Sequence, residues 1–406
     1  MKITGVDIYH VAKIKPPLPN WYPVCVEILT DEGVTGWGET GIPVMTGHES
    51  MPHLIKEIAP MIIGMDPLDT DLIWDKLYKD CYWSYSGGAI SFAAISTLDV
   101  ALWDIKGKVA GLPLYKLLGG RYNENLRSYA SQIQLGWGKN PYVPITPEGY
   151  AEQAMNAVAD GFDAIKVDPF WTDENGLICN PQRSWFPKEK CTPWDWKQFV
   201  RRDHVKMVSE RVRAIREAVG ENVDIIIEMH GMLDVNTSIQ IGRELDQYNC
   251  LYFEEPGASV NPRFVRELKN NVKTPIATGE RIGSVWGFQD MIEHRAIDVA
   301  QPDLGVVGGI TETKRVADFA RVHDVGIQLH NIAGPILTMA GIHLETALSN
   351  FVIHEHIQWS SLEAFRALGK YDFLPENGKL IAPDRPGIGQ ELSEAAKALS
   401  IVTKVR

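Results

Sequence analysis

The sequence lacks the features that mark several large classes of protein. Its five cysteines are scattered and include no C-x-x-C pair, which argues against a disulfide framework or a thiolate zinc site. Basic residues are outnumbered, with 40 Lys and Arg against 52 Asp and Glu, so a net charge of −12 would repel a phosphate backbone. No apolar run is long enough to span a membrane, and the first residues do not resemble a signal peptide. We therefore expect a cytoplasmic protein that binds neither nucleic acid nor membrane.

The composition is that of a globular protein with more than one domain. The chain has 406 residues, and 45% of them are hydrophobic, enough to bury a large core. The first part alternates like β-strands and then shows apolar residues at helical spacing, so we expect an α+β domain over residues 1–125. The expected strands are Lys2–Ala12, Val24–Leu29 and Val34–Glu39, and the expected helices are His48–Met61, Thr70–Lys79 and Ala89–Val109.

Residues 126–368 alternate between short apolar runs and helical patterns. Eight runs with helices between them predict a parallel barrel of the TIM type, and residues 369–406 are expected to return to the first domain. A doubly wound open sheet is the alternative, although no glycine-rich fingerprint follows the first run. The expected barrel strands are Leu126–Ser131, Ala164–Val167, Asp224–Ile227, Leu251–Phe253, Pro275–Ala277, Asp298–Ala300, Gly326–Leu329 and Phe351–Ile353.

Polar residues close the later strands of this barrel at a steady interval of 23 to 27 residues. In a parallel barrel the carboxyl ends of all strands meet at one mouth, where catalytic residues lie. The Trp- and Pro-rich insertion Phe170–Arg202 interrupts the rhythm, and it is either a surface or subunit-contact loop or a lid. The residues at the strand ends are Glu228, Glu254, Glu280, Asp303, His330 and Glu355.

Three of these residues, Glu228, Glu254 and Glu280, could together bind one Mg²⁺ ion. Any one of them alone would more simply be a solvated acid or an ion-pair partner. Three like charges at one mouth are costly without a cation, and Mg²⁺ prefers oxygen ligands, so the set predicts a magnesium site. Glu255 is expected on the opposite face from Glu254, because side chains alternate along a strand.

The remaining strand-end residues are candidates for acid–base chemistry. His330 with Asp303 reads as a base and the acid that orients it, or else as a hydrogen-bonded structural histidine. His230 shares the strand face of Glu228 and is either a general acid or a residue of the rim. Glu355 could donate a hydrogen bond to an oxyanion if its pKa is raised, or it could be a surface acid.

Lys166 and Asp168 end the second barrel strand on one face and are candidate substrate-binding residues. Lys166 could neutralise a substrate carboxylate, or it could simply pair with Asp168. A metal that binds a carboxylate stabilises an enediolate, and a histidine beside it can take the α-proton.

The motifs along the chain resemble one family. Asp99-Val-Ala-Leu-Trp-Asp-Ile-Lys-Gly, continuing to Gly119, is similar to the signature helix of the mandelate racemase group, in its capping domain. Glu254-Glu255-Pro256, Gly279-Glu280-Arg281 and Gln301-Pro302-Asp303 resemble the barrel motifs of the same group. The chain is thus identified as a member of the enolase superfamily. That resemblance implies an α+β capping domain on a modified (β/α)7β barrel and Mg²⁺-assisted removal of an α-proton from a carboxylate.

Within the group the chain is most similar to sugar-acid dehydratases of the galactonate dehydratase type, which carry acid-x-His where this sequence has Glu228-Met-His230. The resemblance implies that His230 protonates a departing β-hydroxyl, His330 takes the α-proton and Glu355 stabilises the enediolate. Two departures stand out. Glu228 occupies a position where Asp is common, and Lys166-Val-Asp168 replaces the Lys-x-Lys of racemases, which disfavours two-base racemisation.

We therefore expect a hydro-lyase that converts an aldonate or aldarate into a 2-keto-3-deoxy acid. An epimerase, racemase or cycloisomerase acting on a related hydroxy acid is the alternative, since one fold hosts many reactions. A sugar-acid-binding protein with little turnover is a third, but a binding module needs no paired base. Specificity is expected in Lys13–Tyr22, Ile42–Glu49 and the insertion. A homo-oligomer is expected, because large barrels are often symmetric assemblies.

Overall fold

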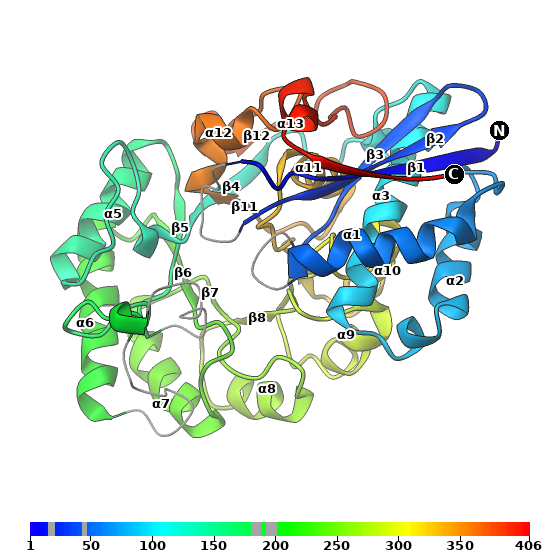
Figure 1. The fold of residues 1–406 in the computed structure, drawn as a ribbon. Coiled ribbons are helices and arrows are strands. Elements are labelled where there is room, and N and C mark those ends of the chain that lie inside the picture. Colours follow the sequence, from blue (N-terminus) through cyan, green and yellow to red (C-terminus); the bar gives the residue numbers. More distant parts are fainter. Residues whose placement is uncertain (15–20, 43–46, 180–187, 192–200) are drawn as a thin grey trace.

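The computed structural model describes residues 1–14, 21–42, 47–179, 188–191 and 201–406. Most of the Trp- and Pro-rich insertion and parts of the two expected specificity loops lie outside these residues. The chain forms a small antiparallel sheet with its own helices and a larger parallel sheet surrounded by helices (Figure 1).

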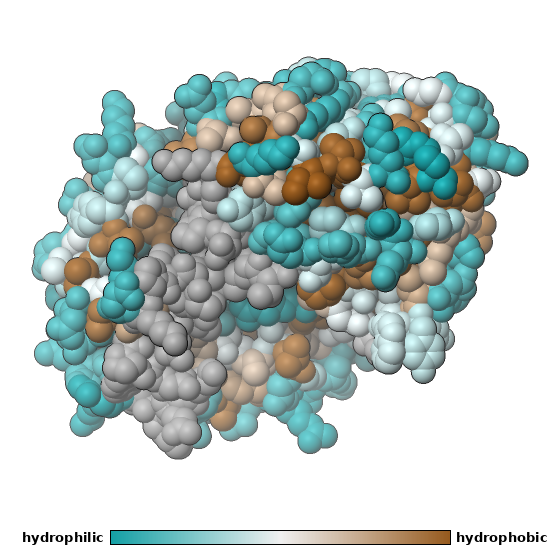
Figure 2. Space-filling view, viewed as in Figure 1, coloured by the Kyte–Doolittle hydropathy of each residue, from teal (hydrophilic) through white to brown (hydrophobic). Residues whose placement is uncertain are grey.

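The face shown in Figure 2 is largely hydrophilic, with hydrophobic residues in separate groups. Among the described residues, no helix combines the length and the apolar character needed to cross a membrane.

The capping sheet has four strands in the order β13-β1-β2-β3. Its turn between β2 and β3 contains Gly33 with φ of 78°, a backbone conformation that favours glycine. β13 pairs with β1, so the two ends of the chain lie close together (Figure 1). The strands are β1 Ile3–His10, β2 Val24–Thr30, β3 Thr35–Glu39 and β13 Ile401–Val405, and the helices are α1 Gly47–Ile58, α2 Thr70–Asp80, α3 Ala89–Ala110 and α4 Leu114–Leu117.

The larger sheet is parallel along the order β10-β9-β8-β7-β6-β5-β4-β11, with a helix after each of the first seven strands in the chain. This confirms the predicted modified TIM-type barrel. Its strands are β4 Leu126–Ser131, β5 Ala164–Val167, β6 Asp224–Glu228, β7 Tyr252–Glu254, β8 Ile276–Thr278, β9 Val299–Ala300, β10 Gly326–Ile327 and β11 His354–Ile357. Its helices are α5 Pro147–Ala159, α6 Arg202–Val219, α7 Val235–Leu245, α8 Pro262–Lys269, α9 Ser284–Glu293, α10 Gly309–Val322 and α11 Pro335–Ala347. The short elements α12 Glu363–Arg366, β12 Lys379–Leu380 and α13 Glu394–Ala398 follow.

The eighth barrel strand differs from the expectation. We expected it at Phe351–Ile353, but β11 begins at His354 and pairs there with β4. Phe351 forms a parallel bridge with Ile327 of β10 instead. This segment thus bridges β10 at Phe351 and pairs with β4 from His354 onward, which closes the barrel. As a result, Glu355 lies inside a strand and not just beyond the end of one.

Two carboxylates of the capping domain are buried against the first turns of barrel helices. Glu39, at the end of β3, accepts backbone N–H groups of Gly334, Ile336 and Leu337 at 2.8, 3.0 and 3.0 Å, where α11 begins. Asp99 of α3 accepts the Thr311 backbone N–H at 3.0 Å and its hydroxyl at 2.6 Å, where α10 begins. A helix N-terminus carries partial positive charge and unpaired N–H groups, so both acids stabilise the docking of the two domains.

Candidate active site

Three glutamates meet at the carboxyl ends of neighbouring barrel strands. Glu228 is the last residue of β6 and Glu254 the last of β7, and they lie opposite each other in the parallel ladder. Glu280 follows β8 after Gly279, whose φ is 147°. One ligand atom of each glutamate lies within 4.8 Å of the other two. The structure thus brings together the three acids that the strand spacing singled out.

This glutamate cluster has the properties of a site for a hard dication. Among the described residues, no group donates a hydrogen bond to the buried Glu254 Oε2, and the buried Glu228 Oε2 has an ion-pair contact with Lys166 but no hydrogen bond. Burial, together with repulsion from Glu228, raises the pKa of Glu254 well above its usual range. Mg²⁺ takes oxygen ligands and would supply the missing positive charge. The donor set therefore fits the metal that the sequence predicts.

Lys166 of β5 lies beneath this cluster with 1% of its surface exposed. Its Nζ is 2.7 Å from Glu254 Oε1, 2.8 Å from Glu355 Oε1 and 3.3 Å from Glu228 Oε2. Burial opposes its charge, yet these three carboxylates hold the pKa of Lys166 well above its usual value. Lys166 therefore pairs as a cation with carboxylates from three other strands.

His330 and Asp303 form the pair that the sequence predicts. His330 Nδ1 lies 2.7 Å from Asp303 Oδ2, and the chain just after β9 bridges the chain just after β10 at these two residues. The other ring nitrogen, Nε2, is 3.4 Å from Glu280 Oε2 and so faces the glutamate cluster. Burial favours the neutral ring, but Glu280, Asp303 and Glu355 raise the pKa of His330 to about 10.

A second histidine–aspartate pair was missed by the sequence analysis. His230 Nδ1 lies 2.9 Å from Asp168 Oδ2, and both side chains are buried. Asp168 also accepts the Phe170 backbone N–H at 2.8 Å, which fixes its carboxylate. Burial favours the neutral form, yet Glu228 and Asp168 raise the pKa of His230 to about 9. The sequence contains a signal for this pair, because Asp168 and His230 follow adjacent strands just as Asp303 and His330 do.

Glu355 does not have the raised pKa that a hydrogen-bond donor role would require. We expected it to donate a hydrogen bond if its pKa is raised, but its pKa is lowered to about 2. Burial opposes ionisation, but Lys166 and His330 outweigh it. As an anion, Glu355 accepts hydrogen bonds from the Ser131 hydroxyl at 2.7 Å and the Asn331 backbone N–H at 2.8 Å. The sequence leaves this condition open, because the position of the Lys166 cation beside Glu355 depends on the fold.

Glu255 also differs from the expectation that it lies on the far face of its strand. β7 ends at Glu254, and Glu255 has φ of 40°, so strand alternation does not extend to it. Its side chain is buried, with Oε2 2.8 Å from Arg281 Nη2. His230, with φ of 46°, is in the same left-handed region. Such backbone conformations cost of order 1–3 kcal/mol each and cluster at functional sites.

Charge at the mouth is unbalanced toward the negative. Among the residues that the structure describes, the cationic groups there are Lys166, Arg281 and, when protonated, His230 and His330. The described carboxylates outnumber them, so a bound dication would stabilise the site. The carboxylates are those of Asp168, Glu228, Glu254, Glu255, Glu280, Asp303 and Glu355.

Comparisons with known proteins cover nearly the whole chain. A family model described as the N-terminal domain of mandelate racemase and muconate lactonizing enzyme matches residues 21–119, and one described as enolase C-terminal domain-like matches residues 149–396. The D-galactonate dehydratase of Xanthomonas euvesicatoria pv. vesicatoria is 33% identical over 402 residues, which are 97% of this chain and 93% of that protein. The D-galactonate dehydratase of Ralstonia pickettii is 32% identical over 404 residues, with the same coverage.

A solved structure is also closely similar. The crystal structure of a member of the enolase superfamily from Salmonella Typhimurium superimposes with a TM-score of 0.93 and 41% sequence identity, and the match covers 100% of both chains. Its likeness extends to the capping domain as well as the barrel.

Proposed function

Because the chain belongs to the mandelate racemase and muconate lactonizing enzyme family of the enolase superfamily, we propose that it is a Mg²⁺-dependent sugar-acid dehydratase. Its substrate would be an aldonate or aldarate and its product a 2-keto-3-deoxy acid. The observation that carries this proposal is that two histidine–aspartate pairs lie beside one cluster of three glutamates. Elimination of water requires two such groups, one to accept a proton and one to donate one.

His330 is the proposed base. Asp303 holds its Nδ1, so Nε2 points toward the glutamate cluster, where a substrate carboxylate and the adjoining α-carbon would lie. A dication bound by the cluster would stabilise the negative charge that develops on that carboxylate, and its charge would offset the carboxylates that raise the pKa of His330. His330 Nε2 then takes the α-proton, and the electron pair left behind moves toward the carboxylate to give an enediolate. As the β-hydroxyl leaves, this electron pair returns to form the carbon–carbon double bond of an enol.

His230 is the proposed acid. Its Nδ1 is held by Asp168, which keeps the ring oriented and favours its charged form. Loss of the β-hydroxyl breaks the carbon–oxygen bond, and the proton from His230 lets that hydroxyl leave as water. The enol then tautomerises to the 2-keto-3-deoxy acid. In this proposal Asp168 acts through His230, which refines its expected role as a substrate ligand.

Lys166 and Glu355 are proposed to support the negative intermediate. Lys166 is enclosed by three carboxylates, so its Nζ lies beside the cluster. Glu355 holds Lys166 and the backbone of Asn331, next to the base. Asp168, which is held against His230, stands where a racemase has its second lysine, and this supports dehydration over racemisation.

The test is to incubate the protein with Mg²⁺ and a panel of aldonic and aldaric acids in D₂O and to follow each by NMR. We expect loss of the C2 proton signal together with a 2-keto-3-deoxy product for at least one acid. His330→Ala should abolish both events, whereas His294→Ala, an exposed histidine at the end of α9, serves as the matched control. A new diastereomer without loss of water would instead indicate an epimerase.

A further inference from the structure

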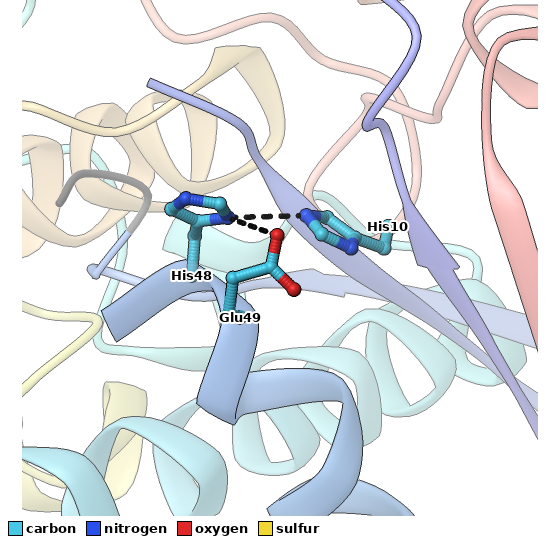
Figure 3. Close-up of side chains that lie close together, drawn as sticks. All are labelled: His10, His48 and Glu49. Carbon is cyan, nitrogen blue, oxygen red and sulfur yellow. Dashed lines mark hydrogen bonds and ion pairs between the residues drawn. The ribbon is translucent and has the colours of Figure 1, made fainter. Parts of the chain in front are cut away.

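A second group of potential metal ligands lies in the capping domain and shares no residue with the glutamate cluster. His10 is the last residue of β1, and His48 and Glu49 lie in the first turn of α1 (Figure 3). One ligand atom from each lies within 4.8 Å of the other two. His10 Nε2 is 3.3 Å from His48 Nδ1, and that same nitrogen is 3.7 Å from Glu49 Oε1. The proposed chemistry at the barrel mouth leaves this cluster unused.

The two imidazoles are held in place before any ligand arrives. His10 is 6% exposed and His48 is 7% exposed, whereas Glu49 reaches in from the surface. The ring of Tyr22 packs against both histidines, with centroid distances of 6.5 Å to His10 and 4.9 Å to His48. Burial lowers the pKa of both histidines, so each ring keeps a free lone pair at neutral pH. The cluster therefore offers two fixed nitrogen donors, from His10 and His48, and one oxygen donor from the exposed Glu49 side chain, which can move.

The spacing of the two nitrogen donors matches one edge of a tetrahedral metal site. With metal–nitrogen bonds of about 2.0–2.1 Å, two ligands on the edge of a tetrahedron lie about 3.3–3.4 Å apart. The His10–His48 nitrogen separation has this value. It is longer than the usual ~2.9–3.0 Å of a hydrogen bond from N–H. The exposed Glu49 carboxylate needs only side-chain rotation to complete the third position.

We propose that His10 Nε2, His48 Nδ1 and Glu49 Oε1 form a second metal site, which takes a first-row transition dication of the zinc class. Three protein ligands leave a fourth position for water or a small anion. Imidazole donors suit Zn²⁺ and its neighbours, whereas Mg²⁺ prefers oxygen alone, so the two clusters would bind different metals. The site would link the end of β1 to the start of α1. It does not depend on the reaction proposed above.

The proposal is tested with the full-length protein after removal of metals by a chelator. Saturating Mg²⁺ is added first to fill the glutamate cluster, and Co²⁺ is then titrated as a spectroscopic probe. A tetrahedral site with nitrogen donors should give strong visible absorption that saturates at one equivalent and disappears when Zn²⁺ is added. Zn²⁺ should also raise the melting temperature, by about 3 °C at a free concentration 100 times its Kd.

Three variants locate the site. Glu49→Gln changes an exposed side chain and should fold normally, yet it should weaken Co²⁺ binding about 100-fold, since the binding free energy is shared among few ligands. His48→Ala should remove the absorption. His53→Gln, an exposed histidine on the same helix, should bind Co²⁺ as the parent protein does. Weak absorption that is insensitive to Glu49→Gln, or absorption lost in Glu254→Gln but not in His48→Ala, would overturn the proposal.

Discussion

Replacing Asp168 by Asn separates the two proton transfers of the proposed reaction. Asp168 Oδ1 accepts the Phe170 N–H and Oδ2 lies against His230 Nδ1. An amide has one oxygen, so if that oxygen keeps the Phe170 bond, the NH₂ group must donate to Nδ1. That interaction favours a neutral His230, which is a far weaker acid. General acid–base catalysis contributes about 10²–10⁴-fold, so we expect dehydration to slow by that factor.

Removal of the α-proton should survive the same substitution, because His330 and Asp303 are untouched. The assay measures C2 deuterium exchange and 2-keto-3-deoxy product in the same D₂O sample, with a substrate found in the panel. Asp168→Asn should retain exchange within a few fold while product formation falls. Asp303→Asn should lower both. Equal loss of exchange and product in Asp168→Asn would refute the division of labour between the two histidines.

Three further outcomes are expected. Glu254→Gln should weaken Mg²⁺ affinity at least about tenfold in calorimetry, because it removes one of three charged ligands, and unchanged affinity would reject the glutamate site. Glu39→Gln should lower the free energy of unfolding in urea by about 2–4 kcal/mol, since one amide oxygen cannot accept three N–H groups; the exposed Glu57→Gln is its control. Burial lowers the pKa of His343 to about 4, so the unfolded chain binds a proton first and stability falls by about 3 kcal/mol from pH 6.5 to 4. His343→Phe, which preserves the stack on Tyr115, should show that much less acid destabilisation in unfolding measured at both pH values.

The sequence predicts the barrel and the clustering of the three glutamates well because both follow from repetition. Expected strands such as Ala164–Val167 coincide with those of the structure, and strand spacing alone brings Glu228, Glu254 and Glu280 together. Periodicity fails where the chain leaves regular structure. Glu255 and His230 have left-handed backbone conformations just beyond strands, and alternation says nothing about side chains there.

Interactions between segments far apart in the sequence could not be predicted either. Lys166 is surrounded by carboxylates from three other strands, so the pKa of Glu355 could be understood only once those strands were placed. Glu39 contacts residues almost 300 positions later, and nothing in its local sequence distinguishes it from a surface acid. Local pattern predicts which residues end strands, whereas the environment of a buried charge depends on the whole fold.

The docking of Glu39 and Asp99 bears on how such proteins can be recombined. A chimera that joins this capping domain to the barrel of a relative would place two buried carboxyl groups against foreign helix starts. It would work only if that barrel offers N–H groups at the places of Gly334 and Thr311. Gly334 must also stay free of a side chain, because a Cβ there would collide with the Glu39 carboxylate. Exchange of the capping domain is therefore restricted to barrels that carry the matching loops.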